Sequence, residues 1–166
     1  MTNPATDVLP DVLDDAEIAA YRRDGYLVPR WRLPAADLSR LQNLMAQLAA
    51  ENPTLLDEPI IGAHLPGGGV QNLNVEAGWI DIARHPRILD MVEQIDGPDL
   101  VLWGTSVFYK RAVAGPGTAW HQDARAWPMI KPTATTSVWI AVTESHKRNG
   151  CIRVIPGSHH DRKIHE

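Results

Sequence analysis

The stretch TAWHQDARAWP, residues 118–128, holds the side chains whose types and spacing could carry out chemistry. His121 and Asp123 lie two positions apart, and in an extended chain such side chains point to the same face. An imidazole nitrogen and a carboxylate oxygen on one face can bind one divalent cation. His121 and Asp123 are therefore candidate catalytic residues and candidate metal ligands, forming part of a site.

Two histidines and one carboxylate on one triangular face of an octahedron bind Fe(II) in non-haem oxygenases and leave three positions open. A strand suits such ligands, because a rigid element fixes the angle between them. A His-x-Asp pattern is short, however, and recurs by chance. The alternative interpretation is a surface histidine beside a solvated aspartate.

The composition limits the class of protein. With 166 residues and 44% hydrophobic side chains, the chain is expected to form one domain with a real core. A net charge of −4 without a run of Lys or Arg indicates no nucleic-acid partner. No stretch approaches the roughly 20 apolar residues of a membrane span, so no membrane partner is expected. The acidic N-terminus does not resemble a signal peptide, and a single cysteine, Cys151, fits a reducing compartment. We expect a cytoplasmic protein.

The first part of the chain has helical patterns. Asp14 or Asp15 can cap a helix that Gly25 ends, and a short strand is expected at residues 26–28. A helix is predicted over residues 34–51, where an apolar stripe comprises Leu38, Leu41, Met45 and Leu48. Residues 65–74 are Gly-rich and predict a loop. Helices follow at residues 76–83 and 86–95, the latter with a core face of Ile88, Leu89, Val92 and Ile95.

The second part changes to short apolar and β-branched runs. Strands are predicted at residues 100–103, 106–109, 119–122, 151–155 and, starting at Thr133 or Ala134, up to Glu144, with a loop at 156–160. Helices followed by closely spaced strands indicate an antiparallel β architecture packed against helices. The expected single domain, 1–166, thus has a mostly helical region (1–98) and a region of strands that carries the His-x-Asp motif (99–166).

The motifs resemble the phytanoyl-CoA dioxygenase (PhyH) family of Fe(II)/2-oxoglutarate-dependent oxygenases in order and spacing over nearly the whole chain. The matching pieces are YRRDGYLVP (21–29), HPRIL (85–89), GP (97–98), FYK (108–110), WHQD (120–123), WP (127–128), VWIA (138–141), NGC (149–151) and VIPGSH (154–159). The resemblance implies a mainly β fold with N-terminal helices, a double-stranded β-helix (a cupin-like jelly roll). It also implies a hydroxylase that acts on a small organic substrate with O₂, releasing succinate and CO₂.

Under this resemblance His121 and Asp123 are the first two iron ligands. Gln122, Trp127 and Trp139 are candidates for contacts with 2-oxoglutarate, and Lys110 could supply positive charge. Trp127 and Trp139 could equally be core residues, and Lys110 a solvated strand residue. Relatives that halogenate carry a small residue at the position of Asp123, so hydroxylation is expected.

No residue of this chain matches the family's distal His ligand or its cosubstrate-binding Arg, so the jelly roll is expected to be incomplete at the C-terminus. Three explanations stay open: a fragment, which we favour, a short form completed by dimerisation or strand exchange, and a degenerate relative. The rival function is a non-catalytic jelly-roll module for binding or assembly. The substrate and the oligomeric state, with a homo-oligomer among the alternatives, are not readable from the sequence.

Overall fold

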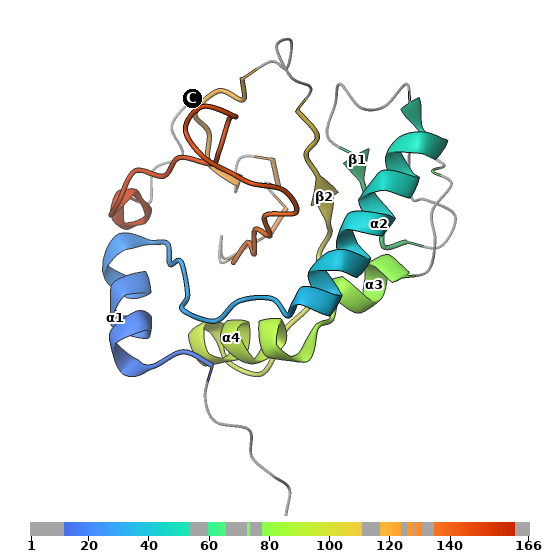
Figure 1. The fold of residues 1–166 in the computed structure, drawn as a ribbon. Coiled ribbons are helices and arrows are strands. Elements are labelled where there is room, and N and C mark those ends of the chain that lie inside the picture. Colours follow the sequence, from blue (N-terminus) through green and yellow to red (C-terminus); the bar gives the residue numbers. More distant parts are fainter. Residues whose placement is uncertain are drawn as a thin grey trace, which may run out of the picture.

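The computed structural model describes residues 12–53, 60–65, 73, 78–110, 117–123, 126–127, 129–130 and 135–161. Its elements are, in order, α1 (Asp15–Asp24), α2 (Ala35–Glu51), β1 (Ile60–Ile61), α3 (Gly78–Ala83), α4 (Pro86–Asp96), β2 (Ser106–Val107) and the 3₁₀ turn η4 (Ser158–His160). In Figure 1 the helices follow one another along the rim of the view, from α1 through α4 to α3 and α2. The four α-helices all precede Gly97, as the sequence predicts, whereas the division into a single domain stays a prediction.

Helix α1 begins and ends where its capping residues predict. The Asp14 carboxylate accepts a hydrogen bond from the Glu17 backbone N–H at 2.8 Å, and the Glu17 carboxylate accepts one from the Asp14 N–H, which forms a capping box. Gly25 ends the helix with φ of 78°, a left-handed conformation that glycine adopts without steric cost.

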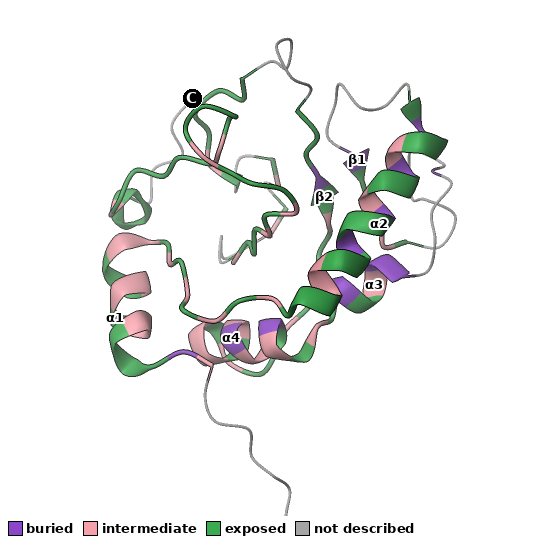
Figure 2. Ribbon diagram, in the orientation of Figure 1, coloured by how far each residue is buried: buried purple, intermediate pink, exposed green. Residues whose placement is uncertain are grey.

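The larger core cluster lies between α2 and α3. The predicted apolar stripe of α2 is confirmed for Leu41 and Leu48, which are buried, whereas Leu38 and Met45 are half-buried and the buried Leu44 was not predicted. The three buried leucines pack against Trp79 and Ile82 of α3, and the cluster also contains Ile60, Ala63, Leu73 and Val107. Figure 2 shows this buried band on the facing sides of the two helices.

The smaller core cluster comprises Leu13, Ile88 and Met91. Helix α4 supplies Ile88 and Met91, while the predicted core residue Leu89 is 40% exposed, so that prediction is wrong. The buried face of α4 runs through Ile88, Met91 and Ile95, because residues three and four apart share one side of a helix. His85 caps α4, with its Nδ1 accepting a hydrogen bond from the Arg87 backbone N–H at 3.2 Å.

Most predicted strands are wrong within the described part of the chain. The one sheet there pairs β1 with β2 in antiparallel register, Ile60 opposite Val107 and Ile61 opposite Ser106. Residues 26–28, 100–103, 119–122, 135–144 and 151–155 have apolar or β-branched character but no ladder partner among the described residues. A strand needs a second chain segment to bond its backbone groups, and a sequence pattern cannot supply one. The predicted loop at 65–74 lies almost wholly outside the described residues.

Residues 135–142, here called the bridging segment, connect the helices to one another. Ile140 packs against both core clusters. The Tyr21 hydroxyl of α1 lies 3.2 Å from the Thr136 hydroxyl, and the Gln42 side-chain amide of α2 donates to the Val142 carbonyl at 2.9 Å. The segment is therefore held at several points, which fixes the residues between them.

The turn at residues 156–160 docks on the C-terminal end of α1, where the last carbonyl groups of a helix lack partners within it. The imidazoles of His159 and His160 donate to the carbonyl oxygens of Arg22 and Arg23 at 3.0 and 3.1 Å. The Gly157 N–H donates to the Asp24 carbonyl at 2.8 Å. His159 and His160 thus have structural roles, as the sequence predicts for His159.

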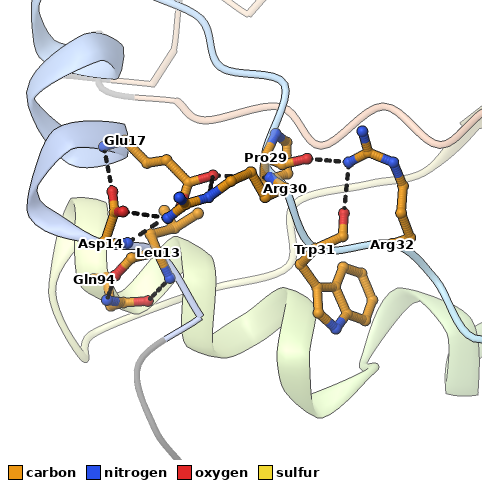
Figure 3. Close-up of polar contacts among 8 residues, drawn as sticks. All are labelled: Leu13, Asp14, Glu17, Pro29, Arg30, Trp31, Arg32 and Gln94. Carbon is orange, nitrogen blue, oxygen red and sulfur yellow. Dashed lines mark hydrogen bonds and ion pairs between the residues drawn. The ribbon is translucent and has the colours of Figure 1, made fainter.

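The N-terminal end of α1 contacts Arg30, which follows the helix, and Gln94 of α4 (Figure 3). The Arg30 guanidinium binds the carboxylates of Asp14 and Glu17. The Gln94 side chain of α4 accepts from the Leu13 N–H at 2.9 Å and donates to the Leu13 carbonyl at 2.8 Å. Hydrogen bonds from the Glu17 backbone and from Arg30 lower the pKa of Asp14, and one from the Arg30 backbone lowers the pKa of Glu17. These contacts fix the angle between α1 and α4.

None of the helices among the described residues is both long and apolar enough to cross a membrane.

We predict that Gly25→Ala destabilises the fold. A Cβ atom there would lie 2.3 Å from Nδ1 of His159, on a backbone with φ of 78°. The strained backbone alone costs roughly 1–3 kcal/mol, and the displaced His159 adds to it. Gly104→Ala is the control, because a Cβ at Gly104 meets no atom within 4 Å. Urea denaturation measures both variants, and an equal loss of stability in the two would contradict the account.

Acid unfolding tests the network at α1. Because the folded-state pKa values of Asp14 and Glu17 lie below their ordinary values, their stabilisation is complete above those ordinary values and is lost as the pH falls through the folded-state values. Asp14→Asn with Glu17→Gln is expected to flatten the fall in urea midpoint between pH 5 and pH 2. An Asp99→Asn control at an exposed position should keep the wild-type slope, and an unchanged slope in the double variant would argue against the network.

Candidate metal centre

His121 is held in one tautomer by the backbone. Its Nδ1 lies 2.9 Å from the carbonyl oxygen of Ala119, an atom that can only accept a hydrogen bond. Nδ1 therefore carries the proton, and Nε2 of the neutral ring presents a lone pair. Metal-binding histidines are usually fixed in this way, because the second ring nitrogen donates to a carbonyl or carboxylate.

Asp123 faces that lone pair. Nε2 of His121 lies 3.4 Å from Oδ1 of Asp123, and the two side chains are 54% and 48% exposed. The prediction that the two side chains point to one side is thus confirmed. The Asp123 carbonyl accepts a hydrogen bond from the Ala126 N–H at 2.9 Å.

The pair fits two ligands of one divalent cation. A nitrogen and an oxygen that each lie about 2.1 Å from a metal, in adjacent coordination positions, are roughly 3 Å apart. The observed separation of 3.4 Å is close to this value. Among the described residues, no group of three His, Cys, Asp or Glu side chains could hold a metal ion, so this pair supplies two of the three ligands that a facial triad needs.

The predicted cosubstrate residues have different surroundings. Gln122 and Trp127 are half-buried, and Trp139 is 49% exposed, so Trp139 is not a plain core residue. The ammonium of Lys110 donates to the Gly150 carbonyl at 2.9 Å, which gives this residue a structural contact. The role of these four residues at a cosubstrate stays a prediction.

Ser137 was not among the residues predicted for the site. Its hydroxyl donates to Oδ2 of Asp123 at 2.9 Å, from the middle of the bridging segment. Ser137 lies two positions before Trp139 on a predicted strand, and this spacing predicts that the two side chains share one face of that strand. Small hydroxyl residues are too common in strands for this spacing to single one out.

The family model of phytanoyl-CoA dioxygenase (PhyH) matches residues 21–166, which include every element described here except the start of α1. The chain belongs to the phytanoyl-CoA dioxygenase family. The resemblance that the sequence motifs indicate is therefore confirmed.

Curated relatives agree with this assignment. An ectoine dioxygenase from Nocardia farcinica is 29% identical over 151 residues, which cover 86% of this chain and 50% of the relative. The peroxisomal phytanoyl-CoA dioxygenase of Homo sapiens is 24% identical over 153 residues, which cover 84% of this chain and 45% of the relative. The chain thus spans about half the length of the curated relatives it matches. No solved structure matches this chain.

We predict that His121→Ala weakens Mn(II) binding by the full-length protein at least tenfold, since even outer-shell changes cost about 10–100-fold. Equilibrium dialysis measures the dissociation constant, with Mn(II) replacing the oxidisable Fe(II). The control is His146→Ala, because His146 forms another pair with a carboxylate, 4.0 Å from Glu144, and is expected to leave binding unchanged. Equal effects of the two substitutions would show that His121 is no specific ligand.

Proposed function

We propose that this chain carries part of the active site of an Fe(II)- and 2-oxoglutarate-dependent dioxygenase that hydroxylates an unactivated C–H bond of a small organic substrate. The observation that carries the proposal is the convergence of Nε2 of His121 and Oδ1 of Asp123 at 3.4 Å, in a member of a dioxygenase family. The relatives are named for two substrates, ectoine and phytanoyl-CoA, and so do not select one for this chain.

His121 and Asp123 would hold Fe(II), and the third ligand would come from outside the described residues. When bound, Fe(II) with 2-oxoglutarate and O₂ would supply the oxidising chemistry that inserts oxygen into the substrate, with succinate and CO₂ as coproducts. The Ala119 carbonyl keeps the proton on Nδ1 of His121, which leaves Nε2 free to bind the metal. The carboxylate of Asp123 contributes negative charge and occupies the place that a halide would need, which supports hydroxylation.

Trp139 and Gln122 are proposed to flank the cosubstrate. Trp139 lies on the bridging segment, two positions from the partner of Asp123, and keeps about half of its surface exposed. Gln122 lies between the two ligands in sequence and is half-buried. Trp127 and Lys110 are proposed as further members of the same pocket, Lys110 through a change of its hydrogen bond to Gly150.

The proposed fold around this site is the family's jelly roll, with the N-terminal helices on its outside. A cytoplasmic enzyme of one domain, with O₂ and a small molecule as its partners, is the setting that we propose.

A non-catalytic module for binding or assembly is the second candidate. The observation in its favour is that the described residues provide two metal ligands and no third. Such a module would bind its partner without consuming 2-oxoglutarate.

The test is turnover of 2-oxoglutarate by the full-length protein with Fe(II), O₂ and a panel of small organic substrates, measured as succinate. We expect succinate from the wild type and a loss of at least about a thousandfold in Asp123→Ala, since removing a group essential to catalysis costs several kcal/mol. Asp99→Ala, at an exposed aspartate outside the site, is the control and should keep wild-type activity.

Full activity of Asp123→Ala would show that Asp123 is not a ligand. A wild-type protein that binds no Fe(II) and forms no succinate would favour the binding module.

A further inference from the structure

We propose that Ser137 is a positioning residue that makes Asp123 bind the metal through one oxygen only. This inference rests on the function proposed above and concerns the same site. It is based on the two oxygens of the Asp123 carboxylate, which have different partners. Oδ1 lies 3.4 Å from Nε2 of His121, whereas Oδ2 accepts the Ser137 hydroxyl at 2.9 Å.

The hydrogen bond fixes which carboxylate oxygen is available. An ionised carboxylate has two equivalent oxygens and can bind a cation through one or through both. With Oδ2 engaged by Ser137, the oxygen that faces His121 is Oδ1. A hydrogen bond to a charged acceptor is among the stronger ones, so turning the carboxylate away from Ser137 carries a free-energy cost.

Ser137 is a suitable anchor because its segment cannot shift easily. The residue before it, Thr136, contacts the Tyr21 hydroxyl at 3.2 Å. Beyond it, Ile140 packs on both core clusters and the Val142 carbonyl accepts from Gln42. The position of the Ser137 hydroxyl is thereby tied to α1 and α2, and Asp123, on an exposed part of the chain, is tied to them through Ser137.

Ser137 lies on an exposed part of the bridging segment. Thr136, Ile140 and Val142 are half-buried, whereas residues 137–139 between them are exposed, including Val138 at 48%. The Ser137 hydroxyl is therefore accessible to Asp123, whose Oδ2 it contacts.

The consequence is the number of coordination positions left open. A facial triad with each ligand bound through one atom leaves three positions on an octahedral cation. 2-Oxoglutarate, chelating through its keto acid, needs two of them and O₂ needs the third. An Asp123 carboxylate that bound through both oxygens would take one of these positions. The hydrogen bond from Ser137 would therefore keep that coordination position open for 2-oxoglutarate.

The experiment compares Ser137→Ala, Ser137→Thr and Ser145→Ala in the full-length protein. Thr keeps the hydroxyl, and Ser145 is an exposed serine outside the site that serves as control. The first readout is the Mn(II) dissociation constant by equilibrium dialysis. The second is the affinity for 2-oxoglutarate of the Fe(II) protein without O₂, from the visible charge-transfer absorption of the chelate.

In Ser137→Ala we expect the Mn(II) dissociation constant to rise about tenfold, since outer-shell partners affect metal affinity about 10–100-fold. We expect the dissociation constant of 2-oxoglutarate to rise by about a further tenfold, beyond the effect of weaker metal binding. Ser137→Thr should restore both constants to near the wild-type values, and Ser145→Ala should match the wild type. Where Ser137→Ala is too unstable to measure, Ser137→Val replaces it, because Val and Thr have the same shape and differ in the hydroxyl.

Wild-type constants in Ser137→Ala would overturn the positioning role while leaving the proposed function standing. Equal losses in Ser137→Thr and Ser137→Val would overturn it as well, because the hydroxyl would then be irrelevant. A wild-type protein that binds neither Mn(II) nor Fe(II) would refute the proposed function itself and this inference with it.

Discussion

The packing of Ile140 on both core clusters is the interaction on which the arrangement depends. The larger cluster holds α2 and α3 together, and the smaller one holds α4 and the residues before α1. Further contacts tie the bridging segment to α1 and α2, through the hydroxyls of Tyr21 and Thr136 and through Gln42 and the Val142 carbonyl. Ile140 lies three residues from Ser137, whose hydroxyl contacts Asp123. Apolar packing thus helps to fix the segment that supports the candidate pair.

The helices could be predicted from the sequence because their signals are local. Asp14 and Gly25 mark the ends of α1, and the leucine stripe of α2 faces the core. The strands could not be predicted equally well, since ladder bonds join residues far apart in the chain. The pairing of Ile60 with Val107 has no signature in either stretch. The bridging segment has the β-branched composition of a strand, but it packs on the helices through Ile140 and pairs with no other described segment.

The proximity of the candidate pair was predictable from the sequence, but the contacts that support it were not. The spacing of two residues predicts His121 and Asp123 on one side, and the two side chains do lie 3.4 Å apart. The Ala119 carbonyl that fixes the imidazole tautomer belongs to the backbone. Any residue type could supply it, so the sequence does not predict this contact. Ser137 approaches Asp123 only after the bridging segment has packed on the helices. The outer contacts of a metal site arise from tertiary structure, whereas the residue types and spacing of its ligands can be recognised in the sequence.

The most direct measurement of the central claim, that His121 and Asp123 share one cation, is an anomalous difference map from crystals of the full-length protein grown with Mn(II). The account predicts one strong peak about 2.0–2.3 Å from Nε2 of His121 and from Oδ1 of Asp123, with Oδ2 still within hydrogen-bonding distance of Ser137. A map without a peak between these two atoms, in crystals saturated with the metal, would contradict it.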